Sequence, residues 1–348
     1  APQSSGFGIS LFGPGQDRPP GAWAYRLSEP GVYPVRLRLR GPDGELLTSI
    51  VTYLLREPAA DDEDRAEPAE VSLLTDVDLH DVGEPTAADD VEPAAEPPVD
   101  PSLLADLDDV LAAFAEHPEV AASFAVAPRT AERLADDEDA AGTLAALTAE
   151  LRRDDRDLIG APYVDVDPAS LVASGLGEEL ARQADLGTAT LATTLGLPFT
   201  DLWVLDGRID PATVGVLQAQ GVTRLVVPES ALVDPVPGAV VSLPGGPPAT
   251  LAVTSVPDQR SLGGEDPVLA AHQLLGRLAA LATVNPDGAR VVVRVDPADV
   301  ERETLDRVLD LFERPGSFLR VRTTHELFAD TPAAPVGALA QPAPQPAE

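Results

Sequence analysis

Acidic residues that follow apolar, strand-like segments are the main candidates for chemistry in this sequence. Asp165 lies in "APYVDVDP", Asp206 follows "LWVL", Glu229 follows "LVVP", and Glu326 comes after the last strand-like segment. Two carboxylates about 5–5.5 Å apart can cleave a glycosidic bond with retention, and a pair about 6.5–9.5 Å apart can do so with inversion. We therefore take Asp165, Asp206, Glu229 and Glu326 as the set from which a catalytic pair could come.

Four residues are candidates for ligand binding. Tyr163, Asp165 and Asp167 share one face if the strand that begins near Asp157 continues that far. Trp203 could stack on a sugar ring, because aromatic faces pack on the apolar faces of sugars. Each has a structural alternative: a tight turn before a helix cap at Asp167, and a place in the core for Trp203, which lies inside a strand.

The segment "TDVDLH" is a candidate metal site. Asp76, Asp78 and His80 stand at two-residue spacing, so an extended strand would present two carboxylates and an imidazole on one face. The chain has neither an HExxH motif nor a G-x-S-x-G nucleophile turn.

Many aspartates have a simpler explanation as helix caps. Asp-Pro opens an apolar helical segment at five places: Asp100, Asp167, Asp210, Asp266 and Asp296. An Asp side chain accepts a free backbone N–H at a helix start, and Pro suits the first helical position. Two of these, Asp167 and Asp296, also follow strands, where barrel enzymes build their active sites.

Strand-like and helical segments alternate from Asp157 to Ser230, with one long helical segment over residues 168–196. Alternation of this kind is typical of parallel βαβ units. Over the whole chain it predicts an α/β fold, a closed or nearly closed (β/α)7–8 barrel. An open doubly wound sheet is the alternative, although no Gly-rich phosphate turn follows any strand.

The predicted organisation has four parts. Residues 1–56 form a small, immunoglobulin-like β domain, either a trimmed sandwich or one that packs on its neighbour; residues 57–70 are an acidic linker. The barrel spans 71–328, interrupted by an acidic segment at 82–100 that is either a loop at the barrel mouth or disordered. The Pro/Ala-rich tail, 329–348, is predicted to be disordered.

The composition excludes several classes of binding partner and site. The net charge is −34 and every basic residue is Arg, so the surface repels nucleic acid and anionic lipid. There is no Cys, which excludes disulfides and thiolate metal sites. No apolar segment approaches about 18 residues, so we expect no membrane span in this chain.

The order of elements resembles the glycoside hydrolase/deacetylase superfamily of β/α barrels. Within it, "GAPYVDVDPASLVASGLGEELARQADLGTATLATTLG", "DGRIDPATVGVLQAQGVTRLVVPES" and "ARVVVRVDP" are similar to an uncharacterised actinobacterial family of exported, membrane-anchored proteins encoded near the lipid II flippase. The resemblance implies a place outside the cell membrane. Two departures stand out: "AVAPRTAERL" lacks the paired His of the metal-dependent deacetylases, and the Glu and Asp of the glycosidases do not transfer cleanly.

These observations together predict an extracytoplasmic envelope protein with a degenerate barrel and no required cofactor. It would bind a cell-wall glycan or an envelope protein at the carboxyl ends of its strands. The alternatives are an active glycoside hydrolase using a carboxylate pair, and a metal-dependent polysaccharide deacetylase using Asp76, Asp78 and His80.

Overall fold

The fold is described from a computed structural model of the chain. It covers the following residues: 9–12, 23–27, 29–56, 67–79, 99–198, 200–244, 250–255, 262, 266–285, 288–313, 318–329 and 338–339.

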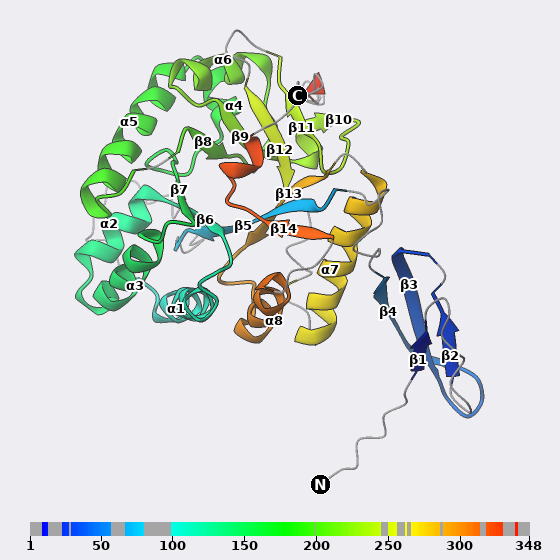
Figure 1. The fold of residues 1–348 in the computed structure, drawn as a ribbon. Helices are drawn as coiled ribbons and strands as arrows, with labels where there is room; N and C mark the ends of the chain where they lie inside the picture. Colours follow the sequence, from blue (N-terminus) through cyan, green and yellow to red (C-terminus); the bar gives the residue numbers. More distant parts are fainter. Residues whose placement is uncertain are drawn as a thin grey trace.

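Seven parallel strands form a nearly closed barrel (Figure 1). Their order around the barrel is β7-β6-β5-β13-β12-β9-β8. The two ends of this order meet where Thr200 forms a parallel bridge with Ile159 and donates its N–H to the Leu158 carbonyl at 3.0 Å. The predicted barrel is thus confirmed. The strands are β5 (Ala69–Val77), β6 (Ala122–Val126), β7 (Arg156–Ile159), β8 (Leu202–Val204), β9 (Arg224–Pro228), β12 (Leu251–Ser255) and β13 (Arg290–Val295).

Helices cover the outside of this barrel, as right-handed crossovers between parallel strands require. Four of the five Asp-Pro pairs are helix N-caps, with Asp100, for example, accepting from the Ser102 N–H at 2.8 Å. The fifth, Asp296, caps a turn instead. The helices are α1 (Pro101–Glu116), α2 (Pro128–Asp136), α3 (Ala141–Leu151), α4 (Pro168–Ala173), α5 (Gly177–Thr194), α6 (Pro211–Ala219), α7 (Pro267–Val284) and α8 (Arg302–Glu313).

The long helical segment predicted over 168–196 is two helices, α4 and α5. Gly175 takes a φ of +76°, and Leu176 donates to the Leu171 carbonyl at 2.8 Å, which is the Schellman ending of a helix. The break turns α5 back along the barrel. Gly187 of α5 then lies so close to the loop after β7 that a Cβ there would be 2.3 Å from the Ala161 carbonyl oxygen.

The barrel interior is apolar in its middle, and its amino end is closed by a segment that follows all seven barrel strands in the sequence. β14 (Leu319–Val321) pairs with only the first residues of β5, and the short helix η4 (Glu326–Phe328) follows it. Leu327 and Phe328 of η4 are buried in the interior. The interior cluster is Leu74, Ile159, Leu202, Val226, Val240, Val253, Val292, Leu327 and Phe328.

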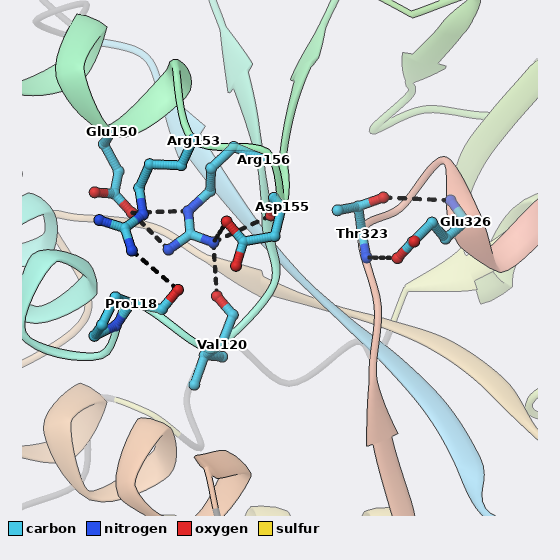
Figure 2. Close-up of polar contacts among 8 residues, drawn as sticks. All are labelled: Pro118, Val120, Glu150, Arg153, Asp155, Arg156, Thr323 and Glu326. Carbon is cyan, nitrogen blue, oxygen red and sulfur yellow. Dashed lines mark hydrogen bonds and ion pairs between the residues drawn. The ribbon is translucent and has the colours of Figure 1, made fainter.

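A buried ion pair fixes the start of β7 (Figure 2). The Arg156 guanidinium, with no exposed side-chain surface, donates from Nε to Glu150 Oε1 at 2.7 Å and from Nη1 to the Val120 carbonyl at 2.8 Å. Arg153 donates to the Pro118 carbonyl at 3.1 Å. These bonds join α3 and β7 to the loop before β6, so the amino ends of two neighbouring strands are held together.

The amino-terminal segment contains a long hairpin that packs on the barrel's helical layer. β3 (Gly31–Arg40) and β4 (Leu46–Arg56) pair antiparallel, and α7 lies against them. Gln273 donates to the Val51 carbonyl at 2.8 Å, and Gly276 leaves room for the Tyr53 ring. Of the predicted immunoglobulin-like domain, the described residues form only this hairpin and the parallel pair β1 (Ile9–Phe12) and β2 (Trp23–Arg26), which do not establish a sandwich.

Helix α7 meets the length and hydropathy criteria for a membrane-crossing helix, within the part of the chain that the structure describes. Length and composition alone are weak support, because the core helix of a globular protein can meet both criteria. In this fold α7 lies between the hairpin and the barrel, and seven of its residues, among them Leu274 and Leu278, are buried.

Two more strand pairings lie outside the seven-strand ring. β11 (Val240–Ser242) is the antiparallel hairpin partner of β12. The tail was predicted to be disordered, but its described residues, β15 (Ala338–Leu339), pair antiparallel with β10 (Leu232–Val233). Leu339 packs on the same apolar cluster as Leu232, which gives this short strand a reason to dock. Residues 57–66 of the predicted linker (57–70) and residues 82–98 of the predicted acidic segment (82–100) lie outside the described residues. Ala69 and Glu70, predicted as linker, already belong to β5, and Asp100 caps α1.

Candidate functional site at the carboxyl end of the barrel

An ion-pair network crosses the carboxyl end of the barrel. Asp76, near the end of β5, accepts from Arg294 Nε of the neighbouring strand β13 at 2.7 Å. The same guanidinium donates from Nη1 to Asp206, which follows β8. Strands β13 and β8 are three places apart in a ring of seven, so Arg294 spans the end of the barrel. We call Asp76, Arg294 and Asp206 the Arg294 bridge.

The Arg294 bridge contains one carboxyl with a strongly shifted pKa. Burial raises the pKa of Asp76 from 3.8 to about 6, although the Arg294 charge and hydrogen bond oppose the rise. The charges of Asp206 and Asp296 raise it further. Burial also disfavours the Arg294 guanidinium, but Asp76 and Asp206 outweigh this and hold its pKa above the usual value. Asp206 is mostly exposed, whereas Asp76 and Arg294 are largely buried.

Two further carboxylates flank the bridge. Asp296 follows β13, and burial raises its pKa even though its side chain accepts from the Ala298 N–H at 3.0 Å. Asp78 follows β5 and accepts from Thr130 Oγ1 of α2 at 3.4 Å. Asp76, Asp206, Asp296 and Asp78 thus bring four acidic side chains to the part of the carboxyl end that surrounds Arg294.

The loop after β7 carries the predicted ligand-binding residues. β7 ends at Ile159, so Tyr163, Asp165 and Asp167 lie in a loop and not on one strand face as predicted. The Tyr163 hydroxyl donates to Glu132 of α2. Asp165 is exposed, and Asp167 caps α4, accepting from the Ala169 N–H at 3.1 Å. Gly207, next to Asp206, lies beside the Asp167 carboxylate, so this loop borders the bridge.

Two candidates lie elsewhere. Trp203 is 7% exposed and packs with Leu180 and Leu217 between the sheet and its helices, so it faces away from the barrel interior and does not line the barrel's carboxyl end. Glu326 lies at the opposite, amino end. It accepts from the Thr323 N–H at 3.0 Å while donating its own N–H to Thr323 Oγ1, which is a capping box on η4 (Figure 2).

Glu229 begins the short helix η2 (Glu229–Ala231) directly after β9, at the carboxyl end and half-buried. Of the four predicted catalytic residues, Asp165, Asp206 and Glu229 thus follow neighbouring strands at one end of the barrel, and Glu326 does not join them.

The predicted metal ligands Asp76, Asp78 and His80 are divided by the structure. Asp76 and Asp78 both lie at the carboxyl end, but Asp76 is bound by Arg294 and Asp78 by Thr130. His80 lies outside the described residues. A guanidinium 2.7 Å from a carboxylate opposes a divalent cation at the same carboxylate by several kcal/mol, so these residues do not fit a metal centre built on Asp76.

Solved structures of carbohydrate-active proteins share this architecture. The chain is similar to a 4-α-glucanotransferase from Thermococcus litoralis (TM-score 0.58, 13% identity), of which it covers 42% with 79% of its own length. It is also similar to a candidate polysaccharide deacetylase from Mycobacterium smegmatis (TM-score 0.54, 15% identity; 82% of this chain, 97% of that one) and to the α-amylase AmyC from Thermotoga maritima (0.56, 10%; 79% and 77%). The fold is a glycoside hydrolase/deacetylase-like barrel. No protein-family model matches the sequence, and no curated protein matches it.

The residue of this glycoside hydrolase/deacetylase-like barrel that sequence reasoning missed is Arg294. The signal was present in "VVVRVD": one charged residue interrupts an otherwise apolar strand and has the same parity as Val292 and Asp296. A charged side chain on the inner face of a barrel strand needs a partner of opposite charge. The alternation along β5, which places Leu74 and Asp76 on the inner face, supplies that partner.

Proposed function

We propose that the carboxyl end of the barrel binds a glycan without hydrolysing it. The observation that carries this proposal is the Arg294 bridge, which holds two carboxylates and a planar guanidinium in fixed positions across the end of the barrel. Such groups offer hydrogen-bond donors and acceptors of defined direction, which suits sugar hydroxyls. The fold, shared with a glucanotransferase, an amylase and a candidate deacetylase, supports a carbohydrate ligand.

The same bridge argues against hydrolysis. A glycosidase needs one carboxylate free to attack or to activate water and another free to deliver a proton. Here the Asp206 carboxylate accepts a hydrogen bond from Arg294, so the guanidinium occupies an oxygen that would otherwise attack or activate water.

The second candidate function is a glycoside hydrolase in which Asp76 is the general acid. Its pKa of about 6 favours this role, because a catalytic acid works best when its pKa lies near the operating pH. Asp165, Asp206 or Glu229 would then supply the second carboxylate.

For the location, we propose that the barrel acts outside the cell membrane, in an envelope protein of an actinobacterium that is membrane-anchored in its full length. The partner is a cell-wall glycan or another envelope protein. The support is the sequence resemblance given above, and fractionation of the source cells would test it: recovery in the cytosolic fraction would refute the proposed location.

The decisive experiment measures binding and turnover on the same ligands. Calorimetric titration with cell-wall glycan fragments should give saturable binding to the wild type, and product analysis should detect no cleavage. Asp206→Asn should weaken binding by about 10-fold or more, since hydrogen bonds to charged groups contribute ~1.5–3 kcal/mol. Asp165→Asn tests the neighbouring loop in the same assay.

A matched control lies at the other end of the same strand. Asp201 precedes β8 as Asp206 follows it, and Asp201 also pairs with an arginine, Arg224. Asp201→Asn should leave binding unchanged. Equal losses of glycan affinity in Asp206→Asn and Asp201→Asn would refute binding at the carboxyl end of the barrel. If the wild type cleaves the glycan and Asp76→Asn does not, the protein is a hydrolase and the binding proposal is wrong.

A further inference from the structure

A buried histidine lies between two surface helices, away from the barrel interior. His117 is the C-cap residue directly after α1, and it is 9% exposed. It lies against α8, which runs beside α1 on the outer layer (Figure 1). The Arg294 bridge is built from barrel strands and their trailing loops, so His117 belongs to neither the barrel interior nor its carboxyl end.

Carboxylates on α8 converge on this imidazole. His117 Nδ1 is 3.1 Å from Glu313 Oε1, and Nε2 is 4.0 Å from Asp306 Oδ1. One donor atom each of His117, Asp310 and Glu313 lie within 4.8 Å of one another. Asp310 and Glu313 are three residues apart on a helix, so they share the face that meets the histidine.

Two buried polar atoms in this cluster have no hydrogen-bond partner. They are His117 Nδ1 and Asp306 Oδ1. Glu313 is close enough to Nδ1 for an ion pair, but the contact lacks the alignment of a hydrogen bond. A buried, unsatisfied imidazole nitrogen is costly, by about 1–3 kcal/mol, unless another group occupies its lone pair.

The position of the carboxylates adds a second cost. Asp310 and Glu313 occupy the last turn of α8, where the helix dipole disfavours negative charge, and that turn has no basic residue. Nearby arginines compensate only in part: Arg307 reaches one oxygen of Asp310 at 3.9 Å, and Arg302 one oxygen of Asp306 at 3.7 Å. A cation between the helices would relieve both costs.

We propose that His117, Asp310 and Glu313 form a divalent cation site of the zinc class. One imidazole nitrogen and two carboxylate oxygens match the ligands that Zn²⁺ takes, at about 2.0–2.2 Å. Bound donors lie closer together than 4.8 Å, and the carboxylates of Asp310 and Glu313, half-buried and exposed, can close the gap. With the metal on Nδ1, the Nε2 nitrogen carries the proton, and this N–H faces Asp306 Oδ1. A histidine that binds a metal commonly donates its other ring N–H to a carboxylate in this way.

Such a site would join the end of α1 to the end of α8, so its role is to hold the outer layer together. It does not rest on the proposed glycan function, and its test uses no glycan. The only other source of the observed contacts is an ion pair between a protonated His117 and its carboxylates.

The test is a zinc titration of the whole chain followed by NMR of the histidine rings. With only four histidines, the ring nitrogens can be assigned individually. Zinc should shift the His117 Nδ1 resonance at one equivalent and leave His272 unchanged. Nickel or cobalt at one equivalent serves as a second probe of the same ligands.

Variants separate this site from weak binding to an acidic surface. Glu313→Gln, which changes an exposed residue, and His117→Gln should each weaken the tightest zinc site by about 100-fold, whereas His272→Gln, at an exposed histidine on α7, should not. Zinc should also raise the melting temperature of the wild type but not of Glu313→Gln. Unchanged affinity in Glu313→Gln, or zinc that shifts no His117 resonance, would leave the ion pair as the whole explanation.

Discussion

The raised pKa of Asp76 makes a specific prediction about stability and pH. In the unfolded chain this carboxyl ionises near 3.8, and in the folded protein at about 6. Between these values the folded state keeps a proton that the unfolded state has lost, so the free energy of unfolding falls as pH rises through this window. At about 1.36 kcal/mol per pH unit, the loss is on the order of 3 kcal/mol, complete above pH 6 and absent below pH 4.

Replacing Asp76 with Asn removes this titration and keeps the shape. Asn cannot ionise, so the free energy of unfolding of Asp76→Asn, minus that of the wild type, should increase by up to ~3 kcal/mol between pH 4 and pH 7. The variant also loses the charged bond to Arg294, but that bond forms only with the ionised carboxylate, so its effect is already contained in the pKa of about 6.

Urea unfolding at half-unit pH steps gives the required curves. Subtracting the wild-type curve from the variant curve removes the contribution that the other carboxylates make to the pH dependence. The exceptions are the two carboxylates whose charges act on Asp76, namely Asp206 and Asp296. Leu47→Ala is the control: it replaces an exposed apolar side chain that does not titrate, so its difference curve should be flat. A flat difference for Asp76→Asn would mean that water or Arg294 solvates the carboxylate fully, and the burial argument would be wrong.

Three further changes test the packing that positions the site, each by urea unfolding. Glu150→Gln should cost up to about 3–5 kcal/mol because it removes the buried partner of the Arg156 charge and leaves that charge only the partly exposed Asp155. Glu179→Gln, in the exposed pair with Arg182, should change stability little, and similar losses in the two variants would contradict the burial difference. Gly187→Ala should cost ~1–3 kcal/mol because its Cβ would meet the Ala161 carbonyl oxygen. Gly215→Ala, which has open space on α6, should stabilise the protein by about 0.5–1 kcal/mol. A Gly187→Ala variant as stable as the wild type would show that the loop after β7 can move to make room. Leu327→Ala should cost ~2–5 kcal/mol against almost nothing for the exposed Leu47→Ala, and a small loss would mean that η4 does not close the barrel.

Much of the barrel could be predicted because its determinants are local. Asp-Pro capped four helices as expected, since both the cap and the fixed φ act within one turn. The strands of the barrel were recognisable because parallel strands are buried on both faces and read as continuous apolar segments. Trp203 lies in the core, which was the alternative to sugar binding, because it belongs to a strand that is buried on both faces.

The candidate site was less predictable because it depends on distances around the ring. The bond from Arg294 to Asp206 joins strands three places apart, and no spacing in the sequence encodes that separation. Glu326 was assigned to the wrong end because β14 pairs with only the start of β5, which a linear pattern does not reveal. Its T-x-x-E spacing with Thr323 was, however, a visible capping-box signal.

The closure of the amino end by η4 bears on how the protein is made. Synthesis proceeds from the amino terminus, and the seven strands emerge before the segment that fills their centre. Until Leu327 and Phe328 arrive, Leu74, Val226 and Val292 border an unfilled apolar lumen. Nascent chains that stop short of this point should therefore attract chaperones, and release from them should coincide with translation of the final helical turn.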